Sequence, residues 1–190
     1  YEIAQCLVGS EMCIRDSSDY KYYTTCIGGF TKGTTSEEMA AGYATLKNDG
    51  VYREPTCITK ITTSDGDEVM SSSTKKRRVY STSAAKQMTD VLKSVVTSGT
   101  GVGAKVPNVD TAGKTGTTQF DSDRWFCGFT PYYTAVIWAG YDDNSKELGN
   151  VVNHNVIWRT IMQTIHENLN LPTGSYEQPS GIVEAAVCSK

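Results

Sequence analysis

Hydrophobic side chains recur at helical spacing in three stretches of the chain, and each stretch predicts a helix with one apolar face. The clearest is residues 81–101, with apolar positions Ala84, Ala85, Met88, Val91, Leu92, Val95 and Val96 and Gly99 just past the end. In residues 155–171 the apolar positions are Ile157, Ile161, Ile165 and Leu169. The third helix follows a capping-box pair, Thr35 and Glu38, and its apolar positions are Met39, Tyr43 and Leu46.

Aromatic and β-branched residues predict strands elsewhere. The stretch TCITKITTSDGDEVM, residues 56–70, indicates a hairpin around a Ser-Asp-Gly turn. Residues 124–129 and 133–140 predict two strands joined by a turn at Thr130-Pro131. A further strand is expected within VDTAGKTGTTQF, residues 109–120, which completes an antiparallel meander. The order helix, hairpin, helix, three strands, helix predicts an α+β fold, an antiparallel sheet flanked by helices.

Composition narrows the class of protein. Of the 190 residues, 38% are hydrophobic and 21% are charged, which is typical of a folded globular domain and unlike a disordered chain. The net charge of −3 gives no basic footprint for nucleic acid, so no nucleic-acid partner is expected. The only basic run, Lys75-Lys76-Arg77-Arg78, is predicted to be a solvated loop. No apolar run reaches the roughly 18 residues that span a bilayer.

The cysteines do not indicate a metal site. Six are scattered along the chain, with no C-x-x-C motif and no metal-ligand spacing to the two histidines. The spacing leaves both free thiols and an occasional disulfide open. A zinc site is therefore not expected.

The ends of the chain differ in character from its middle. Residues 1–17 show no helical or strand period, and CLVGSEMCIRDS within them resembles translated sequencing-adapter scars at the ends of assembled gene fragments. We expect residues 1–17 to be a non-native leader, with a genuine terminus as the alternative. Residues 18–171 are predicted to form the folded part, and residues 172–190 a loop leading into a truncated extension.

The main chemical motif lies in residues 109–120 and has two interpretations. Gly113-Lys114-Thr115 suggests a phosphate-binding loop, which requires G-x-x-x-x-G-K-[ST] followed directly by a helix. Asn108 stands where the first glycine belongs, and the residues after Thr115 are poor helix formers. Nucleotide binding is therefore strongly disfavoured.

The second interpretation is a strand that lines an acyl-transfer site. A lysine on an edge strand, here Lys114, can tune a neighbouring nucleophile and attract a substrate carboxylate. Gly116 has no side chain, so a substrate backbone can approach the strand there. Thr115 and Thr117 offer hydroxyl donors on either side.

Four blocks of sequence resemble, in order and spacing, the transpeptidase domain of penicillin-binding proteins, most closely the bifunctional class with an upstream glycosyltransferase domain. They are GGFTKGTTSEEMAAGYATLKNDGVYREP, MTDVLKSVVTSGTG, AGKTGTT and DRWFCGFTPYYTAVIWAGYDDN. The family carries the signatures S-x-x-K, S-x-N and K-T-G. The resemblance implies a penicillin-binding protein/serine β-lactamase-like transpeptidase fold, incomplete at its N-terminus.

The resemblance also implies residue roles. Lys114 would be the catalytic lysine of the third signature. Thr115 and Thr117 would bind the terminal carboxylate of a peptide donor or of a β-lactam, and Gly116 would keep the strand open to it. The backbone N–H of Thr117 would supply half of the oxyanion hole.

The nucleophile expected from the resemblance is missing. No S-x-N occurs, and S-x-x-K occurs as Ser83–Lys86, Ser72–Lys75 and Ser73–Lys76. A first-turn serine explains Ser83 without chemistry, so these matches are interpreted as coincidental. We therefore expect this chain by itself to be inactive.

For the whole protein the resemblance implies a serine-type D,D-transpeptidase of the bacterial cell envelope. It would cross-link peptidoglycan stem peptides ending in D-Ala-D-Ala and bind β-lactam antibiotics, and the resemblance implies neither a metal ion nor an organic cofactor. It would lie on the extracytoplasmic face of the cytoplasmic membrane, anchored through a segment absent here. The alternative is a non-catalytic module that binds a wall peptide or a partner.

Overall fold

The computed structural model describes residues 33–143, 146–149 and 153–177, together with residues 23, 28 and 30. The predicted helices, hairpin and three strands occur in the predicted order, with two additional short strands, one on either side of the hairpin. The elements are α3 (Ser36–Lys47), β1 (Val51–Arg53), β2 (Lys60–Thr62), β3 (Glu68–Ser71), β4 (Lys76–Arg78), α4 (Thr82–Thr97), η3 (Val102–Ala104), β5 (Ala112–Thr117), η4 (Gln119–Asp121), β6 (Asp123–Phe129), β7 (Thr134–Gly140) and α5 (His154–Asn168).

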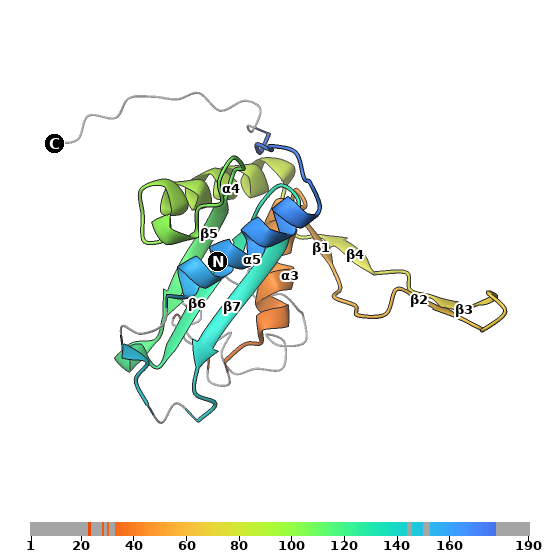
Figure 1. Cartoon of the computed structure of the whole chain (residues 1–190), viewed down its shortest axis with the longest axis horizontal. Helices are drawn as coiled ribbons and strands as arrows, with labels where there is room; N and C mark the ends of the chain where they lie inside the picture. The colour runs from red at the N-terminus through yellow and green to blue at the C-terminus, as the bar shows by residue number, and fades with distance from the viewer. Residues whose placement is uncertain are drawn as a thin grey trace.

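The main body is a three-stranded antiparallel sheet with helices on both faces (Figure 1). The strand order is β5-β6-β7, so β5 is a terminal strand among the described residues. Helix α5 crosses one face of β6 and β7, α3 covers the other face, and α4 lies against β5. The predicted α+β architecture and antiparallel meander are confirmed.

Two hydrophobic clusters hold the sheet between its helices. On the α5 side the buried residues are Val96, Ala104, Val106, Phe126, Trp158 and Met162. Phe126 and Trp158 meet edge to face with ring centroids 4.9 Å apart, and the Trp158 indole N–H donates to the Ala135 carbonyl at 2.9 Å. On the other side the buried residues are Leu46, Leu92, Ala112 and Phe129.

Helix α3 begins as its sequence predicts. Thr35 accepts from the Glu38 N–H, and the Glu38 carboxylate accepts from the Thr35 N–H, which together form the capping box. Beyond the helix, Asp49 and Gly50 take positive φ values of 55° and 83°. A Cβ at Gly50 would lie 2.3 Å from the Tyr80 carbonyl oxygen, so the chain turns there only because the residue is glycine.

The predicted apolar face of α5 is wrong. The helix buries His154, Trp158, Met162 and His166. Ile157 and Ile161 are each 46% exposed and Leu169 is 53% exposed, while Ile165 is partly buried against the core. The predicted isoleucine stripe and the observed buried stripe with Trp158 and Met162 are offset by one residue, which is about 100° around the helix. The larger Trp158 and Met162 fill the surface over Phe126, which turns the isoleucine stripe outward.

Helix α4 departs from its prediction in a smaller way. Its buried positions are Ala85, Thr89, Leu92 and Val96, whereas Val91 is 60% exposed and Ala84 is exposed. Thr89 can be buried because its hydroxyl donates to the Ala85 carbonyl one turn earlier, at 2.9 Å. The aliphatic residues of α4 alone therefore predict a buried face that is rotated slightly from the one observed, because they leave out Thr89.

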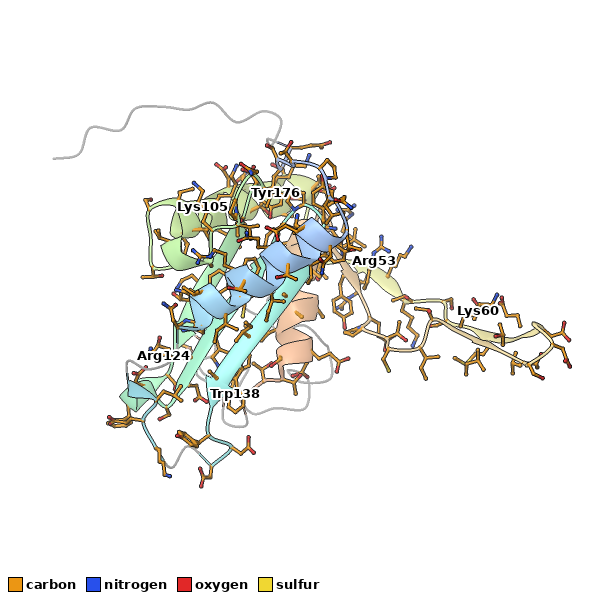
Figure 2. The ribbon with its side chains drawn as sticks, viewed as in Figure 1. Arg53, Lys60, Lys105, Arg124, Trp138 and Tyr176 are labelled. Carbon is orange, nitrogen blue, oxygen red and sulfur yellow. The ribbon has the colours of Figure 1, made fainter. Side chains whose placement is uncertain are left out.

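A narrow arm projects from the body between α3 and α4 (Figures 1 and 2). The predicted hairpin is present as β2 paired with β3, and Gly66 has a φ of 91° in the turn. The basic run is not a loop as predicted. Residues Lys76–Arg78 form β4, which pairs antiparallel with β1, and all three side chains are exposed. Backbone pairing with Val51–Arg53 gives this polar segment its strand conformation.

Candidate functional site

The motif Lys114-Thr115-Gly116-Thr117 lies on β5, at the edge of the three-stranded sheet. Each of its residues has a partner on β6: Lys114 faces Cys127, Thr115 faces Phe126 and Thr117 faces Arg124. After β5 comes a single turn of 3-10 helix, Gln119–Asp121, rather than an α-helix. A phosphate-binding loop needs the helix N-terminus at that point, so the geometry excludes it.

Strand alternation separates the lysine from the two threonines. Side chains of successive strand residues point to opposite faces, so Thr115 and Thr117 share one face and Lys114 and Gly116 share the other. Phe126, the partner of Thr115, packs against Trp158, which assigns the threonines to the α5 side. Lys114 is exposed, and its ammonium donates to the Thr115 carbonyl at 2.8 Å. The cation is thereby held against the strand that bears both hydroxyl groups.

The two glycines of the motif have packing reasons of their own. A Cβ at Gly113 would lie 2.7 Å from Cζ of Phe126 and 2.8 Å from the Cys127 carbonyl oxygen. A Cβ at Gly116 would lie 3.1 Å from Cβ of Trp125, a tighter contact than side chains normally make. Close packing on β6 therefore requires Gly113 and favours Gly116.

The sequence analysis did not single out Thr100, yet it contacts the motif directly. Its hydroxyl oxygen lies 2.7 Å from that of Thr115. Thr100 follows α4, and its carbonyl accepts from the Asn155 side-chain amide of α5 at 3.2 Å. In the sequence, the only hint of a role for Thr100 is its position between two glycines just after a predicted helix. Its contact with β5 is made by the fold.

The turn after the motif is fixed by side-chain hydrogen bonds. Asp123 accepts from the Thr118 hydroxyl at 2.9 Å and from the Trp138 indole N–H at 2.8 Å, at the end of the sheet seen in Figure 2. Arg124 forms an ion pair with Asp121, and this hydrogen bonding lowers the pKa of the Asp121 carboxyl. Phe120 is left 79% exposed, with a φ of 61° that bulky residues rarely adopt.

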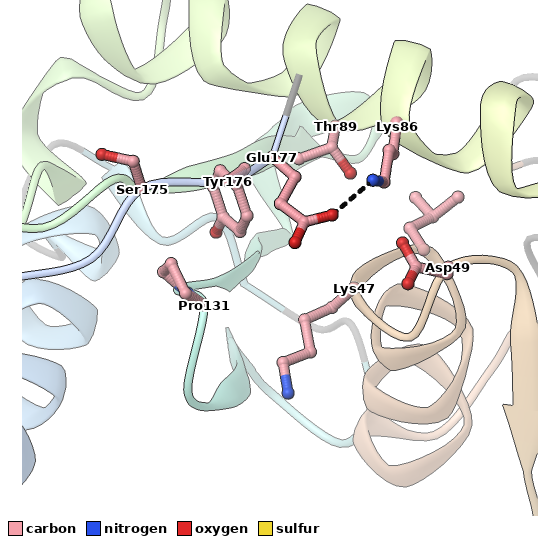
Figure 3. Close-up of a pocket in the computed structure, with 9 residues that line it drawn as sticks. Lys47, Asp49, Lys86, Thr89, Pro131, Ser175, Tyr176 and Glu177 are labelled. Carbon is pink, nitrogen blue, oxygen red and sulfur yellow. Dashed lines mark hydrogen bonds and ion pairs between the residues drawn. The ribbon is translucent and has the colours of Figure 1, made fainter. Parts of the chain in front are cut away.

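The structure keeps Ser83 away from the motif. Ser83 lies in the first turn of α4, where its hydroxyl accepts from Gln87. The opposite end of α4 leads to Thr100 and the motif, about 20 Å further along the helix axis. The Lys86 ammonium is paired with the Glu177 carboxylate at 2.7 Å and not with the Ser83 hydroxyl (Figure 3). The hydrogen bond to Glu177 raises the pKa of Lys86.

The other S-x-x-K matches are also remote or undescribed. Ser72 and Ser73 lie in the arm, between β3 and β4. A further match, Ser18–Lys21, escaped the sequence analysis and lies outside the described residues. Among the described serines, none of these matches is placed at the Lys114 strand.

A hollow of about 220 Å³ lies beside the first half of α4, between the end of α3 and residues 175–177 (Figure 3). Lys47, Lys86 and Glu177 are among its lining residues, and the motif residues Lys114 to Thr117 are not. The hollow is therefore separate from the candidate site. In the described part of the chain, no group of three or more histidine, cysteine, aspartate or glutamate side chains could hold a metal ion.

Comparison with known proteins decides the family. The sequence matches the profile of the penicillin binding protein transpeptidase domain over residues 10–163, most of the chain. The chain belongs to the penicillin-binding protein transpeptidase family. It is 36% identical over 179 residues to penicillin-binding protein 1A/1B of Bacillus subtilis, a match that covers 85% of this chain and 19% of the relative. It is also 36% identical over 164 residues to penicillin-binding protein 1A of Clostridium botulinum, covering 85% and 20%.

Solved structures agree on the transpeptidase fold. The penicillin-binding protein PonA1 from Mycobacterium tuberculosis superposes with a TM-score of 0.77 over 99% of this chain and 55% of that chain, at 22% identity. The D,D-transpeptidase domain of a peptidoglycan glycosyltransferase from Eggerthella lenta gives 0.58 at 29% identity, over 73% of this chain and 33% of that one. This penicillin-binding protein chain spans about a fifth of the length of the curated relatives it matches.

Proposed function

We propose that β5 is the substrate-binding strand of a serine D,D-transpeptidase that cross-links peptidoglycan stem peptides and binds β-lactams. One observation carries the proposal: Thr115 and Thr117 present hydroxyl groups on one face of an edge strand, with the Lys114 ammonium held against that strand. Hydroxyl donors beside a cation suit the terminal carboxylate of D-Ala-D-Ala or of a β-lactam. A protein of the same fold, PonA1, has been solved in complex with penicillin V.

The reaction assigns distinct tasks to the residues. A serine hydroxyl attacks the carbonyl between the two D-alanines, its proton passes to the leaving amine, and terminal D-alanine departs as the ester forms. An acceptor amine then attacks the ester carbonyl, the cross-linking amide forms as the ester C–O bond breaks, and the amine proton passes to the serine oxygen. In this scheme Thr115 and Thr117 bind the donor carboxylate, the Thr117 N–H stabilises the oxyanion, and Lys114 lowers the energy of the negative charge that develops.

The serine and the asparagine-bearing second signature are proposed to come from sequence outside this chain. Two observations support this: the chain has no S-x-N, and Ser83 lies at the far end of α4 from the motif. The chain by itself would then bind donor carboxylates without being acylated. The whole protein is proposed to act on the extracytoplasmic face of the cytoplasmic membrane, held by an anchor. No helix among the described residues is long and apolar enough to cross a bilayer.

Incubation with a fluorescent penicillin tests the assignment of the nucleophile. We expect no covalent label on the 190-residue chain after denaturing electrophoresis, because none of the S-x-x-K serines among the described residues is positioned beside Lys114. The natural full-length protein serves as the positive control, with stoichiometric labelling that slows about a hundredfold in Lys114→Ala. Stoichiometric labelling of the short chain, abolished by Ser83→Ala or by Ser18→Ala, would contradict the proposal.

Reversible binding separates the transpeptidase from the alternative, a non-catalytic wall-peptide module. N-acetylated D-Ala-D-Ala is titrated into the 190-residue chain and followed by NMR chemical shifts. The transpeptidase site predicts that Lys114→Ala weakens binding and that the C-terminal amide of the peptide binds less well than the carboxylate. Binding unchanged by Lys114→Ala would favour the non-catalytic module.

A further inference from the structure

The contact between Thr100 and Thr115 is built into the fold on both sides. Thr100 stands between Gly99 and Gly101, where space is short: a Cβ at Gly99 would lie 2.8 Å from Cα of Val95, and one at Gly101 3.3 Å from Cε2 of Phe126. The Gly99 and Gly101 N–H groups both donate to the Val95 carbonyl, at 3.1 and 3.0 Å. These constraints fold the chain back over the end of α4 and place Thr100 against β5.

Helix α5 fixes the other side of Thr100. Asn155 is at the start of α5, and its amide donates to the Thr100 carbonyl. A Cβ at Gly103 would lie 3.4 Å from Cβ of Asn155, so η3 packs directly on this turn of the helix. Three elements therefore converge on one hydroxyl pair: the end of α4, the start of α5 and the motif strand.

When substrate is bound, the hydrogen bond between Thr100 and Thr115 can run in only one direction. A threonine hydroxyl has one hydrogen to donate and two lone pairs that accept. When Thr115 donates its hydrogen to a substrate carboxylate, the 2.7 Å contact is retained only if Thr100 donates to Thr115. Donation from Thr100 leaves the Thr115 hydrogen free for the substrate and, through polarisation along the chain, makes Thr115 a stronger donor.

We propose that Thr100 is a positioning residue that holds the Thr115 hydroxyl in the orientation that donates to the donor-substrate carboxylate. This assignment rests on the proposed function, since it concerns how the same site binds its substrate. Thr100 acts through Thr115 and needs no contact of its own with the reacting atoms.

The test compares Thr100→Val, which keeps the shape and removes the hydroxyl, with Thr100→Ser, which keeps the hydroxyl. Binding of N-acetylated D-Ala-D-Ala and of its C-terminal amide is measured by NMR titration of the full 190-residue chain. We expect Thr100→Val to weaken carboxylate binding about five- to tenfold, the loss of one hydrogen bond. Thr100→Ser and the matched control Thr97→Val should remain near wild type. Binding of the amide peptide should change little in any variant.

A double-mutant cycle with Thr115→Val isolates the pair. If Thr100 acts through Thr115, Thr100→Val has no further effect once Thr115 is valine. Wild-type discrimination of carboxylate over amide together with an unaffected Thr100→Val overturns the positioning role and leaves the proposed function standing. A wild-type chain that does not discriminate overturns the proposed function, and the positioning role with it. Thr100 is exposed, so the variants should fold; thermal unfolding and a second variant, Thr100→Ala, check this.

Discussion

Trp158→Ala is expected to lower the free energy of unfolding by about 3–5 kcal/mol, the range found when a buried tryptophan or phenylalanine is removed. The Trp158 side chain is fully buried, stacks edge to face on Phe126 and donates to the Ala135 carbonyl. Truncation therefore leaves a cavity between α5 and the sheet and removes the hydrogen bond to the Ala135 carbonyl. Urea titration followed by circular dichroism measures the change.

The neighbouring Ile157→Ala is the matched control. Ile157 belongs to the stripe that aliphatic periodicity predicts to be buried, but it is 46% exposed. Its truncation should cost about 1 kcal/mol or less. An effect of Ile157→Ala that equals or exceeds that of Trp158→Ala would show that the isoleucine stripe faces the core, contrary to the structure.

Stability should fall steeply with rising pH above about pH 9, because one buried and two partly buried acidic groups are held in their neutral forms. Burial raises the pKa of the Cys127 thiol from its ordinary value of 9.0 to about 12. Burial also raises the pKa values of the Tyr43 and Tyr176 hydroxyls, to which the charge of Cys127 adds at Tyr43 and that of Asp110 at Tyr176. The Tyr176 hydroxyl donates to the Phe129 carbonyl at 2.7 Å in its neutral form.

The sign follows from proton linkage. Each folded-state pKa lies above the unfolded value, so the stabilisation is complete below the unfolded pKa and is lost as pH rises through the folded one. In the unfolded chain the thiol ionises near pH 9 and the tyrosines near pH 10. Above pH 10 the loss approaches about 1.4 kcal/mol per pH unit for each group, or about 4 kcal/mol per unit for all three.

Urea midpoints measured from pH 8 to pH 11.5 test this window. Tyr176→Phe should reduce the slope by about 1.4 kcal/mol per pH unit, while Tyr133→Phe, at an exposed position, should leave it unchanged. A free energy of unfolding that stays flat to pH 11.5 would mean that these three groups are not buried as the structure has them.

Local signals in the sequence were reliable where neighbouring residues in the chain settle the structure. The Thr35–Glu38 capping box and the Ser-Asp-Gly turn of the hairpin act over three or four residues, so pattern alone places them. The motif was correctly predicted to be an edge strand, because Gly116 and the β-branched threonines disfavour the helix that a phosphate loop needs. Strand alternation then follows, and with it the shared face of Thr115 and Thr117.

Other features depend on contacts between distant segments. The strand formed by Lys76–Arg78 has no apolar pattern to reveal it and exists because β1 pairs with it. The buried face of α5 was missed because helical periodicity left two adjacent stripes, and the shape of the sheet around Phe126 selected the one with Trp158. The length and direction of α4 place Ser83 at the end of the helix remote from the motif, which no local pattern could show.

The sequence by itself determined the elements, the motif and the family resemblance, because these depend on residue type and short spacing. Only the tertiary structure decided which helix face is buried and which side chains meet the motif. The hydroxyl oxygens of Thr100 and Thr115 are 2.7 Å apart, although the turn Val102–Ala104 and a loop separate the two residues along the chain. Hydrogen bonding and close packing act through space, so no local pattern could place one threonine beside the other.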